Sequence, residues 1–168
     1  MTLATHILVA GAITKPFLGR VNSLVIFIIS IFSHYLSDAI PHFDYKLLSI
    51  EWKEGEKYNS KIHPNAIFIF SDLLNIAIDA SIGAALLIIL ARPEPTFANL
   101  VTYSLIILGG ILPDALQPVF IMWKKFPMSL VQTLHDFWHA KLRLELNRTA
   151  ILSQGFLFLL AAYINSIH

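Results

Sequence analysis

Residues 66–91 read AIFIFSDLLNIAIDASIGAALLIILA and contain only two charged residues, Asp72 and Asp79. A bilayer core of about 30 Å requires about 20 mostly apolar residues in a helix. This stretch is therefore long enough to cross a membrane, and it decides the expected class of fold. Four further apolar stretches lie on either side of it, at Leu3–Thr14, Val21–Ile40, Phe97–Trp123 and Thr149–Ile167.

These stretches predict an all-α protein, in which residues 1–168 form a single polytopic transmembrane bundle of about five helices. Leu3–Thr14 is too short for a simple crossing, so we expect either a short span or a re-entrant helix there. The composition agrees, because charged residues make up 14% of the chain, against roughly 25% in a soluble domain. The net charge of +1 gives no excess of positive charge that would bind nucleic acid. The absence of cysteine excludes disulfides and thiolate ligands.

Two polar connections separate the apolar stretches, at residues 42–65 and 124–148. Because consecutive spans alternate in direction, both connections lie on the same side of the membrane. They carry nine Lys and Arg residues, against three on the opposite side. The positive-inside rule then predicts that both loops face the cytoplasm. The 42–65 connection is either a solvated charged connector or an interfacial flap over a site.

Histidine and aspartate side chains recur toward the loop-facing ends of the apolar stretches. His34, Asp38 and His42 follow one another at intervals of four residues, and His135 and His139 have the same spacing. A charged residue inside an apolar span is costly, so by default it marks a functional site. The predicted metal ligands, which come from five separate elements, are His6, His34, Asp38, His42, Asp114, His135 and His139.

These imidazoles and carboxylates indicate a divalent-metal site at the cytoplasmic interface. A carboxylate-rich set does not select firmly among metals, so zinc is the first expectation, with manganese or iron as alternatives. In a catalytic zinc site, typically three protein ligands leave a position for a water molecule, whose pKa falls to about 7. Asp72 and Asp44 are the predicted catalytic carboxylates, which would act as a general base or orient the ligands. The donors suffice for two metals, and the sequence leaves their number open.

Structural roles are the alternatives for individual members of this set. Asp79, deep in its span, can cap a broken helix or pair with a lysine, and Asp114 can begin a helical turn. His135 and His139 also fit one face of a solvated helix. Two further functions remain open: a small transporter or ion pathway that uses Asp72 and Asp79, and a noncatalytic membrane scaffold whose polar groups join helices.

Two short motifs carry a resemblance to a known family: Thr5-His6 followed by Gly11, and Gly109-Gly110-Ile111-Leu112-Pro113-Asp114. The second resembles the Gly-x-x-x-Pro-Asp helix end of the YdjM-like inner-membrane metal-dependent hydrolases, which are similar in turn to membrane relatives of zinc-dependent phospholipase C. The resemblance implies that His6 and Asp114 are metal-site residues and that the protein lies in a bacterial inner membrane. The family's basic His-Arg-Gly-x-Thr-His-Ser segment is absent, and Leu134–His139 would stand in its place.

The residues and the resemblance together predict a membrane-embedded, metal-dependent hydrolase. We expect it to cleave a phosphoester, such as that of a lipid headgroup, with metal-activated water. Its partners would be membrane lipid or a membrane-proximal small molecule, while the oligomeric state stays open.

Overall fold

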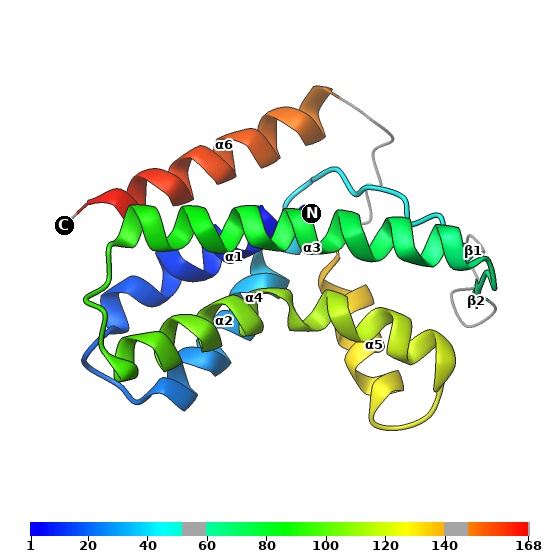
Figure 1. The fold of residues 1–168 in the computed structure, drawn as a ribbon, viewed down its shortest axis with the longest axis horizontal. Helices are drawn as coiled ribbons and strands as arrows, with labels where there is room; N and C mark the ends of the chain where they lie inside the picture. Colours follow the sequence, from blue (N-terminus) through cyan, green and yellow to red (C-terminus); the bar gives the residue numbers. More distant parts are fainter. Residues whose placement is uncertain (52–59, 140–147, 168) are drawn as a thin grey trace.

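The computed structural model describes residues 1–51, 60–139 and 148–167 (Figure 1). Within these ranges the chain is mostly helical, with a single short pair of strands, which confirms the predicted all-α class. Parts of both predicted polar loops, residues 52–59 and 140–147, lie outside the described ranges. The α-helices are α1 Leu3–Thr14, α2 Ser23–Asp38, α3 Ala66–Ala91, α4 Phe97–Met122, α5 Met128–Trp138 and α6 Arg148–Ser166.

Three helices, α3, α4 and α6, are long and apolar enough to cross a membrane. Helix α2 is shorter than the predicted span Val21–Ile40: its 16 residues extend roughly 24 Å. Its start is fixed by the Asn22 side chain, which accepts a hydrogen bond from the Val25 N–H at 3.0 Å. Its last residue is Asp38, because the approach to Pro41 disfavours helical backbone. Length therefore separates α2 from the three candidate spans.

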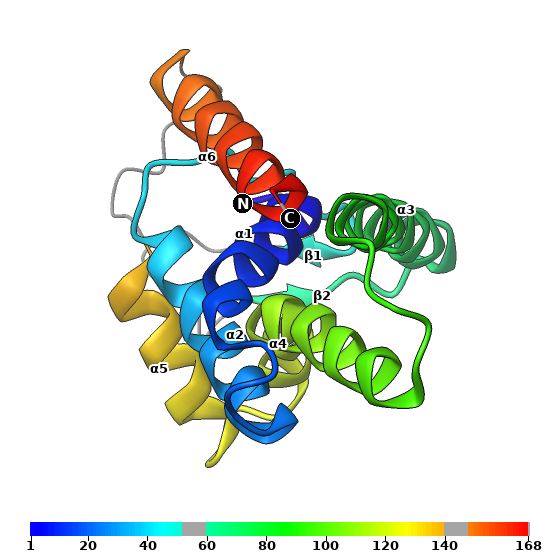
Figure 2. The same ribbon diagram turned by 90° about the vertical axis from the view of Figure 1, so that its left-hand side faces the viewer.

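Helix α1 lies at the centre of the bundle, where it contacts α2, α3, α4 and α6 (Figure 2). Side chains on all of its faces are buried, including Leu3, Ile7 and Leu8. A helix that is apolar on every side is stable when other helices surround it. Its 12 residues extend roughly 18 Å, which is less than the thickness of a bilayer core. The short apolar stretch at the N-terminus is thus an interior helix, enclosed by protein.

An aspartate from α3 caps the first turn of α1. Asp79 Oδ2 accepts the Leu3 N–H at 2.6 Å, and its Oδ1 accepts the Ala4 N–H at 3.2 Å. The first N–H groups of a helix have no partner within the helix, and the positive end of the helix dipole favours a carboxylate. Asp79 therefore acts as a helix cap, which was one of the structural alternatives for this residue.

Glycines allow two pairs of helices to approach closely. A Cβ atom on Gly83 of α3 would lie 2.6 Å from the Ala4 Cα of α1. A Cβ atom on Gly109 of α4 would lie 2.6 Å from the Ser30 Cβ and 2.9 Å from the Phe27 carbonyl oxygen of α2. Small residues at such crossings are common in membrane bundles, because they let backbones come together. The second crossing packs α4 against the middle of α2, about one turn before the candidate ligand His34.

Helix α5 lies within the predicted polar loop 124–148, so the described chain has six α-helices, one more than predicted. It buries Gln132 and His135, whereas Leu130, Leu134 and Phe137 are exposed. The exposed residues are spaced four and three apart and share one face of the helix. This spacing was the available sequence signal for an amphipathic helix. Its polar face packs inward and its apolar face points away from the protein.

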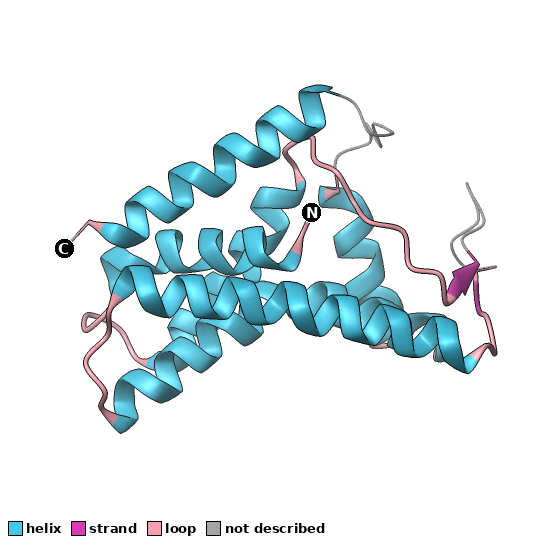
Figure 3. Ribbon diagram, turned by 45° about the horizontal axis from the view of Figure 1, so that its top comes forward, coloured by secondary structure: helices cyan, strands magenta, loops and turns pink. Residues whose placement is uncertain are grey.

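A short hairpin interrupts the helical fold between α2 and α3 (Figure 3). Strands β1 Ile50–Glu51 and β2 Lys61–Ile62 pair antiparallel, with Ile50 opposite Ile62. Ile50 packs with Phe120 and Ile121 in a small apolar cluster near the end of α4. The hairpin therefore attaches the described part of the 42–65 connection to α4.

The packing at Gly109 predicts a stability difference between two glycine substitutions. Gly109→Ala places a methyl group against α2 and should destabilise the fold by about 1–3 kcal/mol, as overpacking does. Gly155→Ala on α6 is the control, because no atom lies within 4 Å of the added Cβ. Thermal unfolding in detergent measures both variants. Equal stability of Gly109→Ala and the parent protein would contradict the close approach.

Candidate metal centre

The seven predicted metal ligands lie together around one buried carboxylate, that of Asp38. Two sets of donor atoms are close enough to hold a metal ion, with all atoms of a set within 4.8 Å of one another. The first set contains His34, Asp38, Asp114 and His135, and the second contains Asp38, His42 and His139. The seventh, His6, contacts both aspartates of the first set.

Four imidazoles surround the Asp38 carboxylate, whose side chain is 2% exposed. The Nε2 atoms of His34 and His135 lie 3.1 and 3.4 Å from Oδ2. The Nε2 atoms of His6 and His42 lie 3.2 and 3.6 Å from Oδ1. The intervals of four residues explain part of this arrangement, since they place His34 and Asp38 on one face of α2. Packing of α1 and α5 against α2 and α4 adds the other rings.

Asp114 supplies the second carboxylate of the first set. Its Oδ1 lies 3.3 Å from His135 Nε2 and 3.7 Å from His34 Nε2, and its Oδ2 lies 3.7 Å from His6 Nε2. Gln117 donates a hydrogen bond from Nε2 to Asp114 Oδ1 at 2.8 Å and holds this carboxylate in place. Gln117 was not among the predicted site residues, although its i, i+3 spacing from Asp114 was a usable signal.

The sequence predicted that Asp114 lies near the end of its helix, but the structure places it further inside. Helix α4 continues through Pro113 and Pro118 to Met122, so Asp114 is about two turns from the last residue. The Gly-x-x-x-Pro-Asp motif therefore falls inside a long helix. Each of these prolines lacks the backbone N–H that would donate a helical hydrogen bond, which is a usual cause of a helix kink.

Backbone carbonyl groups fix the protonation of two imidazoles. His34 Nδ1 lies 2.8 Å from the Gly110 carbonyl oxygen, and His42 Nδ1 lies 2.7 Å from that of Ile40. A carbonyl oxygen can only accept a hydrogen bond, so both Nδ1 atoms donate. A neutral imidazole carries one proton, and the Nε2 atoms therefore present lone pairs to the carboxylates.

A serine fixes His6 in the same way. Ser37 Oγ donates to the His34 carbonyl oxygen at 2.8 Å, so it accepts the hydrogen bond from His6 Nδ1 at 2.9 Å. The His6 ring also stacks on the His34 ring, with 3.9 Å between the ring centroids. Ser37 was not predicted as a metal-ligand or catalytic residue; it serves to orient one that was.

The resulting arrangement fits a bound cation. Among the described residues, the buried Nε2 atoms of His6, His34 and His42, together with Asp38 Oδ1, have no hydrogen-bond partner. Lone pairs that face carboxylate oxygens repel them unless positive charge lies between the two, and buried polar atoms without partners are costly. Bonds of 2.0–2.2 Å in a tetrahedral site imply roughly 3.3–3.6 Å between ligand atoms. The nitrogen–oxygen distances of 3.1–3.7 Å match this spacing.

Asp44 lies at the outer edge of the second set. Its Oδ1 is 3.2 Å from His42 Nε2, and its Oδ2 is 3.3 Å from His139 Nε2. The Met1 α-amino group forms an ion pair with the same carboxylate. The Asp44 side chain is 46% exposed, compared with 23% for Asp114 and 2% for Asp38. It is therefore the carboxylate of the cluster that water reaches most readily.

Electrostatic coupling within the cluster shifts two pKa values outside the candidate spans. Burial lowers the pKa of His135, but hydrogen bonds to Asp114, Asp136 and Asp38 outweigh it and raise the pKa to about 10. Burial raises the pKa of Asp44, but hydrogen bonds with His139 and His42 outweigh it and hold the pKa well below its usual range. The carboxylates thus attract positive charge strongly to this region.

Asp72, predicted to be catalytic, has a different environment. Its Oδ1 accepts the Leu48 N–H at 3.0 Å, and its Oδ2 accepts the Ser49 N–H at 2.6 Å. These bonds attach the segment before β1 to α3. Its contacts among the described residues are thus with that segment, whereas those of Asp44 are with the histidine cluster.

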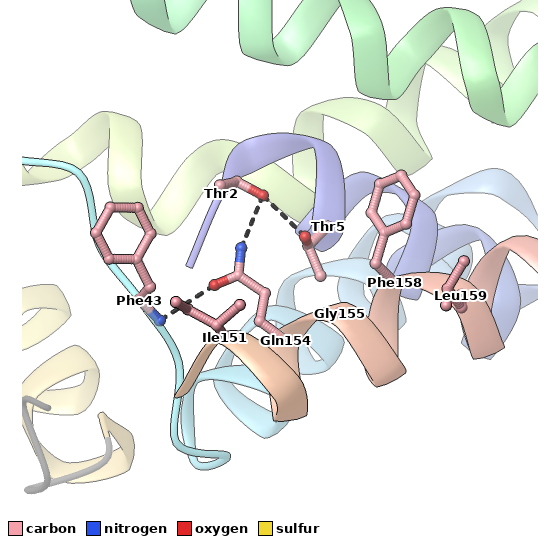
Figure 4. Close-up of a pocket in the computed structure, with 8 residues that line it drawn as sticks. All are labelled: Thr2, Thr5, Phe43, Ile151, Gln154, Gly155, Phe158 and Leu159. Carbon is pink, nitrogen blue, oxygen red and sulfur yellow. Dashed lines mark hydrogen bonds between the residues drawn. The ribbon is translucent and has the colours of Figure 1, made fainter. Parts of the chain in front are cut away.

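An apolar groove of about 430 Å³ lies beside the cluster, between the start of α1 and α6 (Figure 4). Phe43, between His42 and Asp44 in the sequence, forms one side of it. The Gln154 side chain accepts the Phe43 N–H at 3.1 Å and donates to Thr2 Oγ1 at 3.1 Å. Other lining residues on α6 are Ile151, Gly155, Phe158 and Leu159.

Comparisons with protein-family models, with curated proteins and with solved structures give no match. The class of the protein is therefore defined by its fold and by the His/Asp cluster alone. It is a mostly helical protein with three helices long and apolar enough to cross a membrane, and with buried His/Asp groups that can hold a metal ion. The resemblance to the YdjM-like family stays a prediction.

Metal analysis of the purified protein tests this centre. Protein extracted without chelator should retain a divalent metal, detected by mass spectrometry of the elements. Asp38→Asn keeps the shape of the side chain but removes its charge, so it should weaken metal binding at least tenfold, the scale seen for lost metal-site interactions. Asp72→Asn is the matched control and should retain the metal. A metal-free parent protein would contradict the assignment.

Proposed function

We propose that the protein is a membrane-embedded, metal-dependent hydrolase that cleaves a phosphoester of a membrane lipid. The observation that carries this proposal is the set of buried imidazole Nε2 atoms without hydrogen-bond partners, which face two carboxylates. A divalent cation, with zinc as the first candidate and manganese or iron as alternatives, supplies a Lewis acid for a phosphoryl oxygen and a water nucleophile near neutral pH.

Four residues of the first set would bind such a cation directly, and a backbone carbonyl group orients one of them. His34, Asp38, Asp114 and His135 would be the ligands, because they form the set with the most donors, all within 4.8 Å of one another. Gly110, through its carbonyl oxygen, orients the His34 ring so that Nε2 faces the carboxylates. Fixing the ring in this way removes the cost of ordering it when a ligand binds.

Asp44 is our candidate for the proton acceptor. It contacts His42 and His139 of the cluster, yet nearly half of its side chain is exposed. A general base must reach both the cluster and the reacting water, and a partly exposed carboxylate satisfies both conditions. Asp72, with both oxygens bound to backbone N–H groups, has a structural role in this proposal.

Two features favour a lipid as the source of the phosphoester. The groove beside Asp44 is apolar, and its volume falls within the range of about 300–1,000 Å³ typical of small-molecule sites. Helix α5 points Leu130, Leu134 and Phe137 outward while His135 reaches the cluster. A helix with an outward apolar face is typical of a membrane interface. An acyl chain in the groove would leave the headgroup beside the cluster.

We also propose that the site faces the cytoplasm from a bacterial inner membrane. The excess of Lys and Arg in the two polar connections supports this orientation. The resemblance to the YdjM-like hydrolases supports the type of membrane.

The transport alternative relied on Asp72 and Asp79 within α3. Each of these carboxylates accepts two backbone N–H groups, which accounts for its presence without a transport role. The scaffold alternative predicts the same bundle without bound metal. Transport and scaffold functions both stay predictions, and no structural observation favours either of them over hydrolysis.

Hydrolysis can be tested directly with metal-loaded protein in detergent. Phosphatidic acid, phosphatidylglycerol and phosphatidylethanolamine would be offered, and the products identified by mass spectrometry. Asp44→Asn should lower kcat by at least about 100-fold, since general-base catalysis contributes about 10²–10⁴. Asp72→Asn should retain most of the activity. Failure of the loaded parent protein to cleave any phosphoester would refute the proposed function.

The groove makes a separate prediction about chain length. Gly155→Phe should direct a ring into the groove, because no atom lies within 4 Å of the added Cβ. Its kcat/KM for a long-chain substrate should fall at least tenfold, while a dibutyryl substrate with the same headgroup should be cleaved as by the parent. Leu152→Phe, at a position on α6 that is 71% exposed, is the control. Equal losses for both substrates would show that the groove does not hold the chain.

A further inference from the structure

We infer that the cluster binds two metal ions, with Asp38 as the carboxylate shared between them. This inference rests on the proposed metal centre and specifies how many ions it holds. Asp38 is the one residue that belongs to both sets of clustered donors. The remaining donors of the second set, His42 and His139, are not needed by the first.

The two oxygens of Asp38 face different parts of the cluster. Oδ2 is directed to the first set, at 3.1 Å from His34 Nε2 and 3.4 Å from His135 Nε2. Oδ1 is directed to the second set, at 3.6 Å from His42 Nε2, and it also lies 3.2 Å from His6 Nε2. A carboxylate that offers one oxygen to each side can join ions about 3.5–4 Å apart, the usual separation in two-metal sites.

His42 supplies the independent observation for the second ion. Its proton lies on Nδ1, which donates to the Ile40 carbonyl oxygen, so Nε2 carries a lone pair. This Nε2 atom is buried without a hydrogen-bond partner, 3.2 Å from Asp44 Oδ1 and 3.6 Å from Asp38 Oδ1. Repulsion between the lone pair and two carboxylates is removed by a cation among them.

Neighbouring groups complete the second set. His139 directs Nε2 toward Asp44 Oδ2 at 3.3 Å, and its ring lies edge-on to that of His42, with centroids 4.7 Å apart. The Met1 α-amino group gives positive charge to Asp44 and lies 3.9 Å from Asp38 Oδ1, but it leaves His42 Nε2 without a partner. His42, His139 and the shared carboxylate of Asp38 are an ordinary ligand set for zinc or manganese.

A second ion would suit the proposed chemistry. In a displacement at phosphorus, charge develops on both the attacking and the leaving oxygen. Paired ions stabilise both oxygens of an in-line displacement. The position of the second set next to Phe43, at the edge of the groove, is where a headgroup phosphate would approach.

Counting bound manganese tests the inference without any need for hydrolysis. The intact protein in detergent, loaded with Mn²⁺ and freed of excess ion, should contain two ions per chain. Its electron paramagnetic resonance spectrum should show the exchange coupling of two ions joined by a carboxylate. His139→Gln and His42→Ala should each lower the content to one ion and remove the coupling. His63→Ala, at an exposed histidine outside the cluster, should keep two coupled ions.

The outcomes separate this inference from the proposed function. One ion per chain in the saturated parent, or two coupled ions in both His139→Gln and His42→Ala, would overturn the shared site. His139 is partly exposed near the end of α5, so its substitution tests the site even when His42→Ala fails to fold. Two coupled ions without phosphoester cleavage would support the inference while removing the proposed reaction. Phosphoester cleavage by a protein with one bound ion would support the proposed function and overturn the inference of two ions.

Discussion

The negative charge of Asp38, buried inside an apolar helical bundle, is the constraint on which the rest of the structure depends. A carboxylate in such a place is stable only when positive charge and hydrogen-bond donors surround it. Its ionic partners among the described residues are four imidazoles and the Met1 α-amino group. Four rings can reach one carboxylate only if the helices that carry them approach closely, which explains the central position of α1 and the glycines of α4.

The polar groups of the apolar helices fall into two kinds. Asp72, Asp79 and Asn165 are satisfied by the backbone: the two aspartates accept N–H groups, and Asn165 donates to the carbonyl oxygens of Leu8 and Ala161, both at 2.9 Å. These residues fix the positions of segments and helices. The cluster around Asp38 is different, because the rings of His6, His34 and His42 are held through Nδ1 while their Nε2 atoms are left without a hydrogen-bond partner. Polar atoms that are oriented but unsatisfied indicate a ligand site.

The relation of α5 to the cluster explains how a buried site can remain accessible. The helix places His135 inside and its apolar side chains outside, which reverses the pattern of an amphipathic helix on a soluble protein. Asp44, the most exposed carboxylate of the cluster, contacts His139 just after α5, and the apolar groove lies next to α1 and α6. The cluster is thus covered by helices, and its most exposed carboxylate is that of Asp44.

The sequence by itself determined the helical class, three of the four predicted full-length spans and the identity of the clustered residues. Length and apolar composition are local properties, and they were sufficient for α3, α4 and α6. The spacing of His34 and Asp38 was sufficient to place them on one helix face. Only the tertiary structure decided that α1 is interior, that α5 is a helix, and that Asp72 and Asp79 bind backbone groups while Asp44 joins the cluster. These outcomes depend on which faces of distant helices meet, and such contacts are set by packing rather than by the periodicity of any one segment.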